Sequence, residues 1–335
     1  MKRVLFGVSV ALILAGAQVT FGQSHGNPFV DHSDRGETVH VLPAPALVHN
    51  PHETQPIDAP PSDFASVFPA SYGAGNLANH GGPQIPSAKF FQVYFGSSAA
   101  NAGGTSLGYA TLQAEINGFI NNFGGSIGGP TSYASNDPAA DYTIIHQYGT
   151  SGTPIAFAIG NGGAFVDTTP PKGSRFSDSQ VRSYLAGLFD SGKITSPDPD
   201  TIYGIYFPSG VKISLQGGTS CSSFCGYHGN FTYLGKDIKY AVFPYTNCRA
   251  CSLSGKAVLD ILTMVTSHEI REAVTDPDLD SWYDGQGYEA DDKCAWHNLY
   301  PMTRGGFWVQ PEYSNGGTVS GTTYPGPGCI VPNNK

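Results

Sequence analysis

The stretch SHEIREAVTDP, residues 267–277, carries the strongest structural signal in this chain. The residues before and within it recur at intervals of three and four, which is the spacing of one face of an α-helix. This face comprises Val258, Ile261, Val265, His268 and Glu272. We therefore predict a helix that Ser254 caps at its start and that Pro277 ends.

His268 and Glu272 occupy positions on this face where the spacing calls for apolar residues. A buried carboxylate without a partner is costly, and a divalent cation held between the two side chains would remove that cost. Glu269 lies roughly 100° around the helix from His268, where it could reach a water molecule beside the metal. This arrangement is that of H-E-x-x-H zinc hydrolases, with Glu272 in place of the second histidine. The alternative is an exposed acidic turn.

The composition favours an exported protein that binds neither nucleic acid nor membrane. Of its 335 residues only 13% are charged, and the net charge is −9, which disfavours nucleic acid as a partner. Residues 1–22 are typical of a secretory signal peptide, because Lys2 and Arg3 precede an apolar run that is too short to span a membrane. We expect a secreted, extracellular protein after cleavage.

All six cysteines lie in the last part of the chain, at Cys221, Cys225, Cys248, Cys251, Cys294 and Cys329. In an oxidising compartment an even number of cysteines predicts disulfides, here three. The alternative is a zinc ribbon built from the first four.

The chain divides into three parts. After the signal peptide, residues 23–85 are rich in Pro, His and Gly and predict a disordered leader, in which His40 and other histidines could scavenge metal weakly or only be solvated. Residues 86–335 predict one α/β domain. Its expected strands cover 89–96, 141–148, 154–159, 201–208 and 238–245, and its expected helices before the metal-candidate helix cover 111–123 and 177–191.

The order of these elements predicts a single zincin-like domain with a mixed twisted sheet, backing helices and a disulfide-stabilised C-terminal part. Pro244 places the strand 238–245 at an edge of the sheet, since proline cannot donate to a strand ladder. Zinc peptidases of the zincin type likewise build strands, a backing helix and an edge strand before the ligand helix.

The chain resembles the EXORDIUM-like, or phosphate-induced protein, family of secreted proteins over roughly residues 80–310. The shared motifs are His80-Gly81-Gly82-Pro83, Val93-Tyr94-Phe95-Gly96, Cys221-x3-Cys225-Gly226-Tyr227-His228, Cys248 with Cys251, His268-Glu269-x-x-Glu272, Trp282-Tyr283 and Glu289-x-x-Asp292-x-Cys294. The resemblance implies an extracellular protein that is linked, in plants, to growth and cell-wall physiology. It does not by itself imply an enzymatic activity.

A catalytic zinc ion takes three protein ligands and leaves one position for water. Glu289 and Asp292 are the candidates for the third ligand, because both match the family motif and the turn-rich segment before them could fold back over the helix. Asp278 and His228 are alternatives, and His297 ranks last among them. Calcium is a second candidate metal.

The calcium hypothesis rests on acidic residues at alternating positions, namely Asp276, Asp278, Asp280 and Asp284. Ser281 and Gly287 replace the glycine and glutamate of an EF-hand loop, so only an irregular calcium site would fit.

Two functions follow from these observations. The first is a secreted zinc-dependent hydrolase, metallopeptidase-like, in which His268 and Glu272 with Glu289 or Asp292 hold the metal and Glu269 is the general base. Its partner would be a peptide. The second is a non-catalytic extracellular protein that binds a cell-wall or other extracellular polymer, with Trp282, Trp296 and Trp308 as candidate groove residues.

Overall fold

The computed structural model describes residues 26–48, 66–103, 107–124, 132–134, 137, 140–150 and 153–333. The expected signal peptide, residues 1–22, lies outside this part of the chain. None of the helices in the described part combines the length and apolar character that a membrane span requires.

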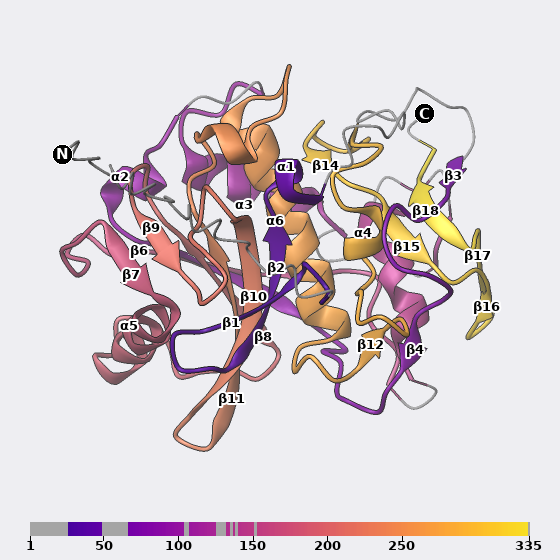
Figure 1. Cartoon of the computed structure of the whole chain (residues 1–335), viewed down its shortest axis with the longest axis horizontal. Helices are drawn as coiled ribbons and strands as arrows, with labels where there is room; N and C mark the ends of the chain where they lie inside the picture. The colour runs from indigo at the N-terminus through magenta and orange to yellow at the C-terminus, as the bar shows by residue number, and fades with distance from the viewer. Residues whose placement is uncertain are drawn as a thin grey trace, which may run out of the picture.

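A mixed seven-stranded sheet, in the order β1-β2-β10-β11-β8-β5-β6, forms the centre of the molecule (Figure 1). Strands β6, β5, β8 and β11 run parallel to one another, whereas β10 is antiparallel to both β11 and β2. The strands in this order are β1 (Val30–His32), β2 (Thr38–Pro43), β10 (Phe224–Tyr233), β11 (Lys236–Phe243), β8 (Thr201–Tyr206), β5 (Lys89–Tyr94) and β6 (Gly160–Val166). The predicted mixed sheet is confirmed.

Helices cover both faces of this sheet. Because successive side chains of a strand point to opposite faces, Tyr203 and Ile205 of β8 pack on the side of α5 (Asp178–Asp190), while Ile202 and Tyr206 pack on the side of α3 and α6. Helix α3 spans Leu112–Asn122 and helix α6 spans Val258–Thr275. The result is a three-layer α/β arrangement that agrees with the predicted fold class.

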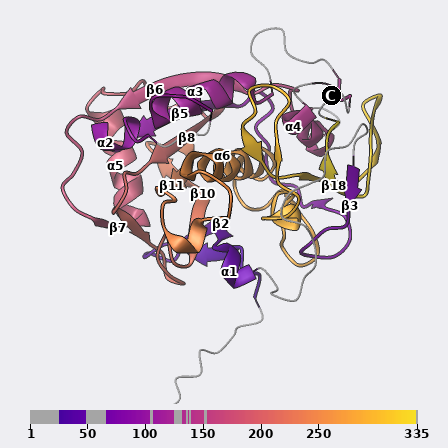
Figure 2. The same ribbon diagram turned by 90° about the horizontal axis from the view of Figure 1, so that it is seen from above.

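Helix α6 lies between the sheet and the C-terminal part of the chain (Figure 2). Every residue from Leu259 to Thr275 is buried, including the charged ones. The sequence predicted one buried face, but the C-terminal segments cover the other faces as well. The helix ends before Pro277 as predicted. Its start differs, because the Ala257 N–H donates to the Asp260 carboxylate at 2.7 Å and Ser254 plays no capping part.

The C-terminal part is built from short strands that pair with one another and, through β12 and β18, with segments nearer the beginning of the chain. These pairs are β12 (Trp282–Tyr283) with β4 (Ala78–Asn79), β13 (Tyr300–Pro301) with β14 (Trp308–Val309), β15 (Glu312–Ser314) with β18 (Gly328–Val331), β18 with β3 (Ser66–Phe68), and β16 (Gly317–Val319) with β17 (Thr322–Tyr324). The remaining elements are β7 (Arg175–Ser177), β9 (Lys212–Ser214), α1 (Pro45–Val48), α2 (Ser97–Ala100), α4 (Ala140–Thr143) and the 3-10 helices η1 (Ile144–Tyr148), η2 (Arg249–Cys251) and η3 (Asp292–Cys294).

The six cysteines form three disulfides, Cys221–Cys248, Cys225–Cys251 and Cys294–Cys329, with sulfur separations of 2.14, 2.01 and 2.07 Å. The first two tie the start of β10 to the segment that leads into α6, and the third ties η3 to β18. Paired sulfurs cannot be thiolate ligands, so a zinc ribbon is excluded. Three disulfides are consistent with an extracellular protein.

The expected leader is partly folded, which corrects the prediction that the domain begins at residue 86. Strand β2 lies inside the main sheet between β1 and β10, and its residues Val39, Val41 and Leu42 are buried. Residues 66–85 contribute β3 and β4. The Pro- and His-rich composition concealed the short alternation of β2. Residues 49–65 lie outside the described part.

Three further predictions of local structure were wrong. Residues 141–148 form α4 and η1 instead of a strand. Residues 154–159 form no regular strand, and the next strand, β6, begins at Gly160. Strand β11 is an interior strand between β10 and β8. It ends at Phe243, so Pro244 follows the ladder and removes no hydrogen bond from it.

Candidate metal centre

Three histidines and three carboxylates meet between the sheet and helix α6. His40 of β2 and His228 of β10 are directly opposite each other in the strand pair. Strand alternation turns both toward α6, since their neighbours Val39 and Tyr227 pack on the opposite face. Helix α6 supplies His268 and Glu272, and the segment after β12 supplies Glu289 and Asp292.

The first group of potential metal ligands consists of His40, His228, Glu272 and Glu289. From His40 Nδ1 the distances are 3.6 Å to Glu272 Oε2 and 3.4 Å to Glu289 Oε1. From His228 Nε2 they are 3.6 Å to Glu272 Oε2 and 3.7 Å to Glu289 Oε2. These distances exceed hydrogen-bond lengths but are close to the roughly 3.3 Å that separates two ligand atoms of one tetrahedral zinc ion.

The second group consists of His268, Glu272 and Asp292. His268 Nε2 lies 3.1 Å from Glu272 Oε2 and 3.9 Å from Asp292 Oδ1. Asp292 also lies near the sheet, since its Oδ2 is 3.5 Å from His40 Nε2. Asp292 joins the pair from the H-E-x-x-E motif, whereas Glu289 joins the two histidines of the sheet.

Backbone hydrogen bonds fix the carboxylates so that one oxygen of each stays available. The Asp292 N–H donates to Glu272 Oε1 at 3.0 Å, and the Glu289 N–H donates to Asp292 Oδ2 at 2.9 Å. The other oxygens, Glu272 Oε2 and Asp292 Oδ1, are buried and have no hydrogen-bond partner. Unpartnered buried carboxylate oxygens that converge on imidazole nitrogens are the donor set of a divalent cation.

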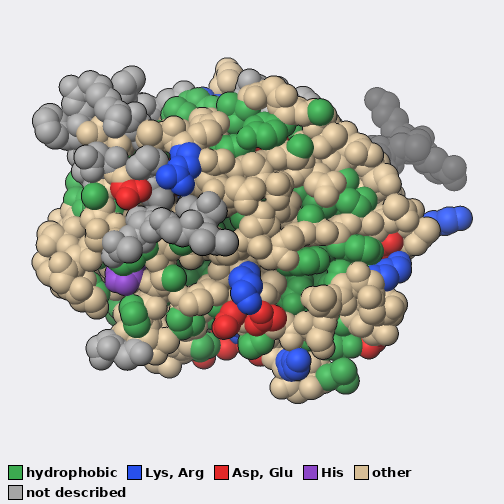
Figure 3. Space-filling view, turned by 180° about the vertical axis from the view of Figure 1, so that it is seen from behind, with side chains coloured by type: hydrophobic (Ala, Val, Ile, Leu, Met, Phe, Trp, Pro, Cys, Tyr) green, Lys and Arg blue, Asp and Glu red, His purple; other side chains and the backbone are tan. Residues whose placement is uncertain are grey.

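The whole cluster is shielded from solvent. His40 is 3% exposed and His228, His268, Glu272 and Asp292 are 0% exposed. In the view of the back of the molecule, histidine contributes only a small patch of the surface (Figure 3). The donors therefore lie inside the protein and not on its face.

Burial and the negative charge of neighbouring carboxylates both oppose the ionisation of the carboxyl groups in this cluster. Burial raises the pKa of Glu269, Glu289 and Asp292 well above the ordinary carboxyl range, and the charge of Glu272 raises each further. Burial also acts on Glu272, but His268 and its histidine neighbours hold the pKa of that carboxyl well below its usual range. A bound cation would favour the ionised form of all of them.

Glu269, the predicted general base, lies at the edge of this cluster. Its side chain is 0% exposed, and neither carboxylate oxygen has a hydrogen-bond partner. Gly226 of β10 makes room for it, because a Cβ atom at that position would lie 2.8 Å from Glu269 Oε1. Glu269 is thus a buried carboxylate without a hydrogen-bond partner, one residue after the metal-ligand candidate His268.

Asp276 is an additional acidic residue at the same place. Its Oδ1 accepts the N–H groups of Asp280 and Ser281, both at 2.7 Å, while Oδ2 is buried without a partner. Burial raises the pKa of Asp276, and His40 and His228 lower it. The sequence had suggested this residue only as part of an acidic loop.

The other candidate ligands have different partners. Asp278 pairs with the Lys239 ammonium, and Asp284 pairs with Lys293 Nζ at 2.7 Å. Two of the four acidic residues of this loop therefore pair with lysines, and the loop forms no group of potential metal ligands among the described residues. His297 lies 3.5 Å from the Tyr72 hydroxyl and does not join the cluster.

The tryptophans do not share one groove. Trp296 is buried and donates its indole N–H to the Pro43 carbonyl, Trp282 packs against Tyr148, and Lys256 lies over Trp308.

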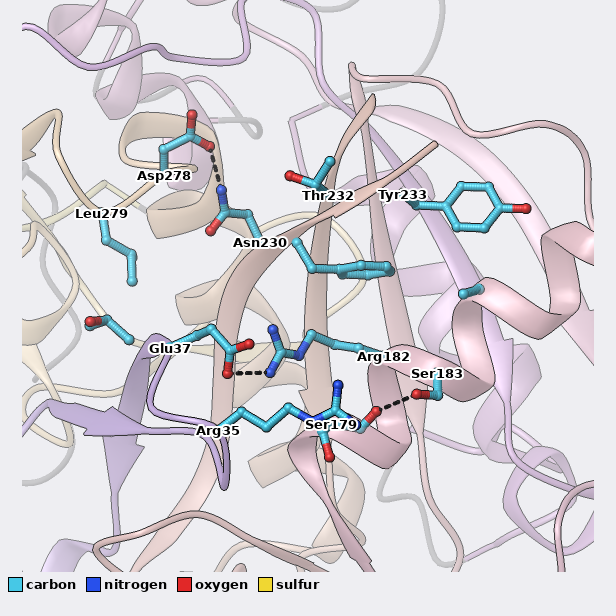
Figure 4. A pocket seen from close by; sticks show the side chains of 13 residues that line it. Arg35, Glu37, Ser179, Arg182, Ser183, Asn230, Thr232, Tyr233, Asp278 and Leu279 are labelled. Carbon is cyan, nitrogen blue, oxygen red and sulfur yellow. Dashed lines mark hydrogen bonds and ion pairs between the residues drawn. The ribbon is translucent and has the colours of Figure 1, made fainter. Parts of the chain in front are cut away.

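A polar groove of about 710 Å³ opens beyond the ends of β2 and β10 (Figure 4). It is lined in part by Thr38, Asn230 and Asp278, which are two residues from His40, His228 and Asp276. The Asn230 side chain donates to Asp278 at 3.2 Å and so joins β10 to the segment after α6 at one end of the groove. Residues that line the groove are therefore close in sequence to residues of the cluster, although the buried donors themselves do not line it.

Comparison with protein-family models, with characterised proteins and with solved structures finds no match for this chain. The resemblance to the EXORDIUM-like family stays a prediction. Of the residues in the cluster, the sequence singled out His268, Glu269, Glu272, Glu289 and Asp292 as site residues and His228 as an alternative. It placed His40 in the leader, where the alternation of Thr38-Val39-His40-Val41 was the only signal of a strand.

Proposed function

We propose that this protein is a secreted zinc-dependent hydrolase of the metallopeptidase-like kind. The observation that carries the proposal is Glu269, a buried carboxylate without a hydrogen-bond partner that directly follows the metal-ligand candidate His268 on helix α6. Three protein ligands and an adjacent carboxylate are the requirements of a catalytic zinc site, which keeps its fourth position for water.

His268, Glu272 and Asp292 would hold the zinc ion, which when bound acts as a Lewis acid and lowers the pKa of a coordinated water molecule. Glu269 would accept the proton from that water and pass it to the leaving amine. The backbone N–H groups that hold Glu272 and Asp292 keep their free oxygens in place. The family resemblance supports this proposal.

The test is the substitution Glu269→Gln in the secreted chain, with turnover of a peptide library and bound metal measured together. We expect turnover to fall by about 10²–10⁴-fold while the metal content stays unchanged, because Gln keeps the shape but cannot accept the proton. Glu115→Gln is the matched control, since Glu115 is a fully buried carboxylate on α3. Turnover that survives Glu269→Gln would refute the assigned role.

A second function is supported by the burial of the cluster. Closed sites with no accessible donor are typical of structural metals, and no donor of the two groups is more than 3% exposed. The protein would then be a metal-stabilised, non-catalytic binding protein for an extracellular polymer. Stoichiometric metal, loss of thermal stability on chelation and no turnover of any peptide would favour it over the hydrolase.

A further inference from the structure

The two groups of candidate ligands share one atom. Glu272 Oε2 lies 3.6 Å from His40 Nδ1 and 3.6 Å from His228 Nε2 in the first group, and 3.1 Å from His268 Nε2 in the second. A carboxylate that belongs to two neighbouring groups of metal-ligand candidates can bridge two metal ions. The histidines come from three different elements, so the arrangement is not a consequence of one helix face.

We propose that the cluster holds two zinc ions at once, bridged by Glu272. His40, His228 and Glu289 complete the first position, and His268 and Asp292 complete the second. The mixture of imidazole and carboxylate donors suits zinc. The inference concerns metal binding and does not depend on hydrolysis.

The charge of the cluster supports two ions. Five carboxylates are buried here, on Glu269, Glu272, Asp276, Glu289 and Asp292. With all five carboxylates ionised, one divalent cation would leave three negative charges in a site without solvent, whereas two would leave one. Isolated buried charge is costly, so the second ion has a clear energetic role.

The nearby basic side chains are engaged elsewhere. Arg271 pairs with Asp291 and Glu312, Lys293 pairs with Asp284, and Lys239 pairs with Asp278. None of these cations is free to neutralise the carboxylates of the cluster.

The two positions differ in the number of their donors. The first has four protein donors, the number that is typical of a permanently held structural zinc. The second has three and lies beside Glu269, so it keeps one position for an exchangeable ligand. We therefore infer that the first ion stabilises the fold and the second one serves the chemistry.

The experiment is metal analysis of the full secreted chain after equilibration with zinc and exhaustive dialysis. We expect two zinc ions per chain in the native protein, one in His228→Asn and one in His268→Asn. Glu272→Gln should weaken the binding of both ions by at least tenfold. His146→Asn is the matched control, because His146 is a buried histidine outside the cluster, and it should retain two ions.

Anomalous scattering at the zinc edge from crystals of the native chain gives a measurement that needs no variant. Two peaks separated by about 3.5–4 Å would support the proposal. A single peak, or one ion per chain that both histidine variants lose, would overturn it. Two ions without turnover would refute only the hydrolase, and one ion with turnover that requires Glu269 would refute only the second metal position.

Discussion

At the scale of single residues, helix α6 places charged side chains where a globular protein usually puts leucine, and each of them has a defined electrostatic partner or converges on the cluster. Arg271 is the clearest case. It is 0% exposed, its Nε lies 2.7 Å from Glu312 Oε2, and its guanidinium also contacts Asp291. Asp291 precedes the ligand candidate Asp292, so Arg271 helps to position the segment that carries this candidate.

Arg271→Met should destabilise the protein by about 3–5 kcal/mol, because it leaves two buried carboxylates without their cation. Urea unfolding measures the change. Lys89→Met is the matched control, since it breaks an ion pair with Asp198 that is largely exposed and should cost only about 0–1 kcal/mol. Equal losses for the two variants would contradict the role assigned to Arg271.

At the scale of elements, the metal centre depends on segments that are far apart in the chain. Strand β2 brings His40 across from His228. The two residues are almost 190 positions apart in the sequence, which is roughly the length of a domain. The segment that carries Glu289 and Asp292 is held by η3 and by the disulfide from Cys294 to Cys329. The site forms only when both segments dock on α6.

Truncation tests the role of β2. A chain that begins at Gly26 should fold and keep its metal, whereas one that begins at Ala44 loses β2, exposes the edge of β10 and should lose both stability and metal. Circular dichroism and metal analysis report on the two properties. In the full-length chain, His40→Ala should keep the secondary structure and lose only one of the two zinc ions, because the group of His268, Glu272 and Asp292 is untouched. A stable, metal-loaded chain from Ala44 would show that the leader is dispensable after all.

At the scale of the whole molecule, the C-terminal segments convert an open α/β sheet into a core that encloses α6 on every side. This enclosure also affects groups away from the metal centre. Burial raises the pKa of Asp141, at the start of α4, to about 7, against a smaller lowering influence from Tyr300 and Arg271. The folded protein therefore binds a proton there at a pH where the unfolded chain does not.

The sign of the resulting pH dependence follows from linkage. A carboxyl whose pKa is raised by folding contributes stability below its unfolded value of about 4, and that contribution is lost as the pH rises toward 7. The loss amounts to about 3–4 kcal/mol for this group, as an order of magnitude. Asp141→Asn should therefore become more stable relative to the native protein as the pH increases from 4 to 8. A stability difference that stays constant over this range would contradict the assignment.

Local features that depend only on neighbouring residues could be predicted from the sequence. The spacing of apolar residues predicted α6, α3, α5 and the strands β5 and β8, and the end of α6 before Pro277 follows from the missing proline N–H. The motif also identified His268, Glu272 and Glu269, because one helical turn brings i and i+4 together whatever the fold.

Which distant residues complete the candidate site could not be predicted, because it depends on the tertiary structure. His40 could not be assigned from its Pro- and His-rich surroundings, since its position depends on the pairing of β2 with β10. The separation of Glu289 from Asp292 between the two ligand groups likewise depends on how the segment after β12 docks on α6. Local periodicity fixes which face a side chain takes, whereas long-range strand pairing and docking fix what that face meets.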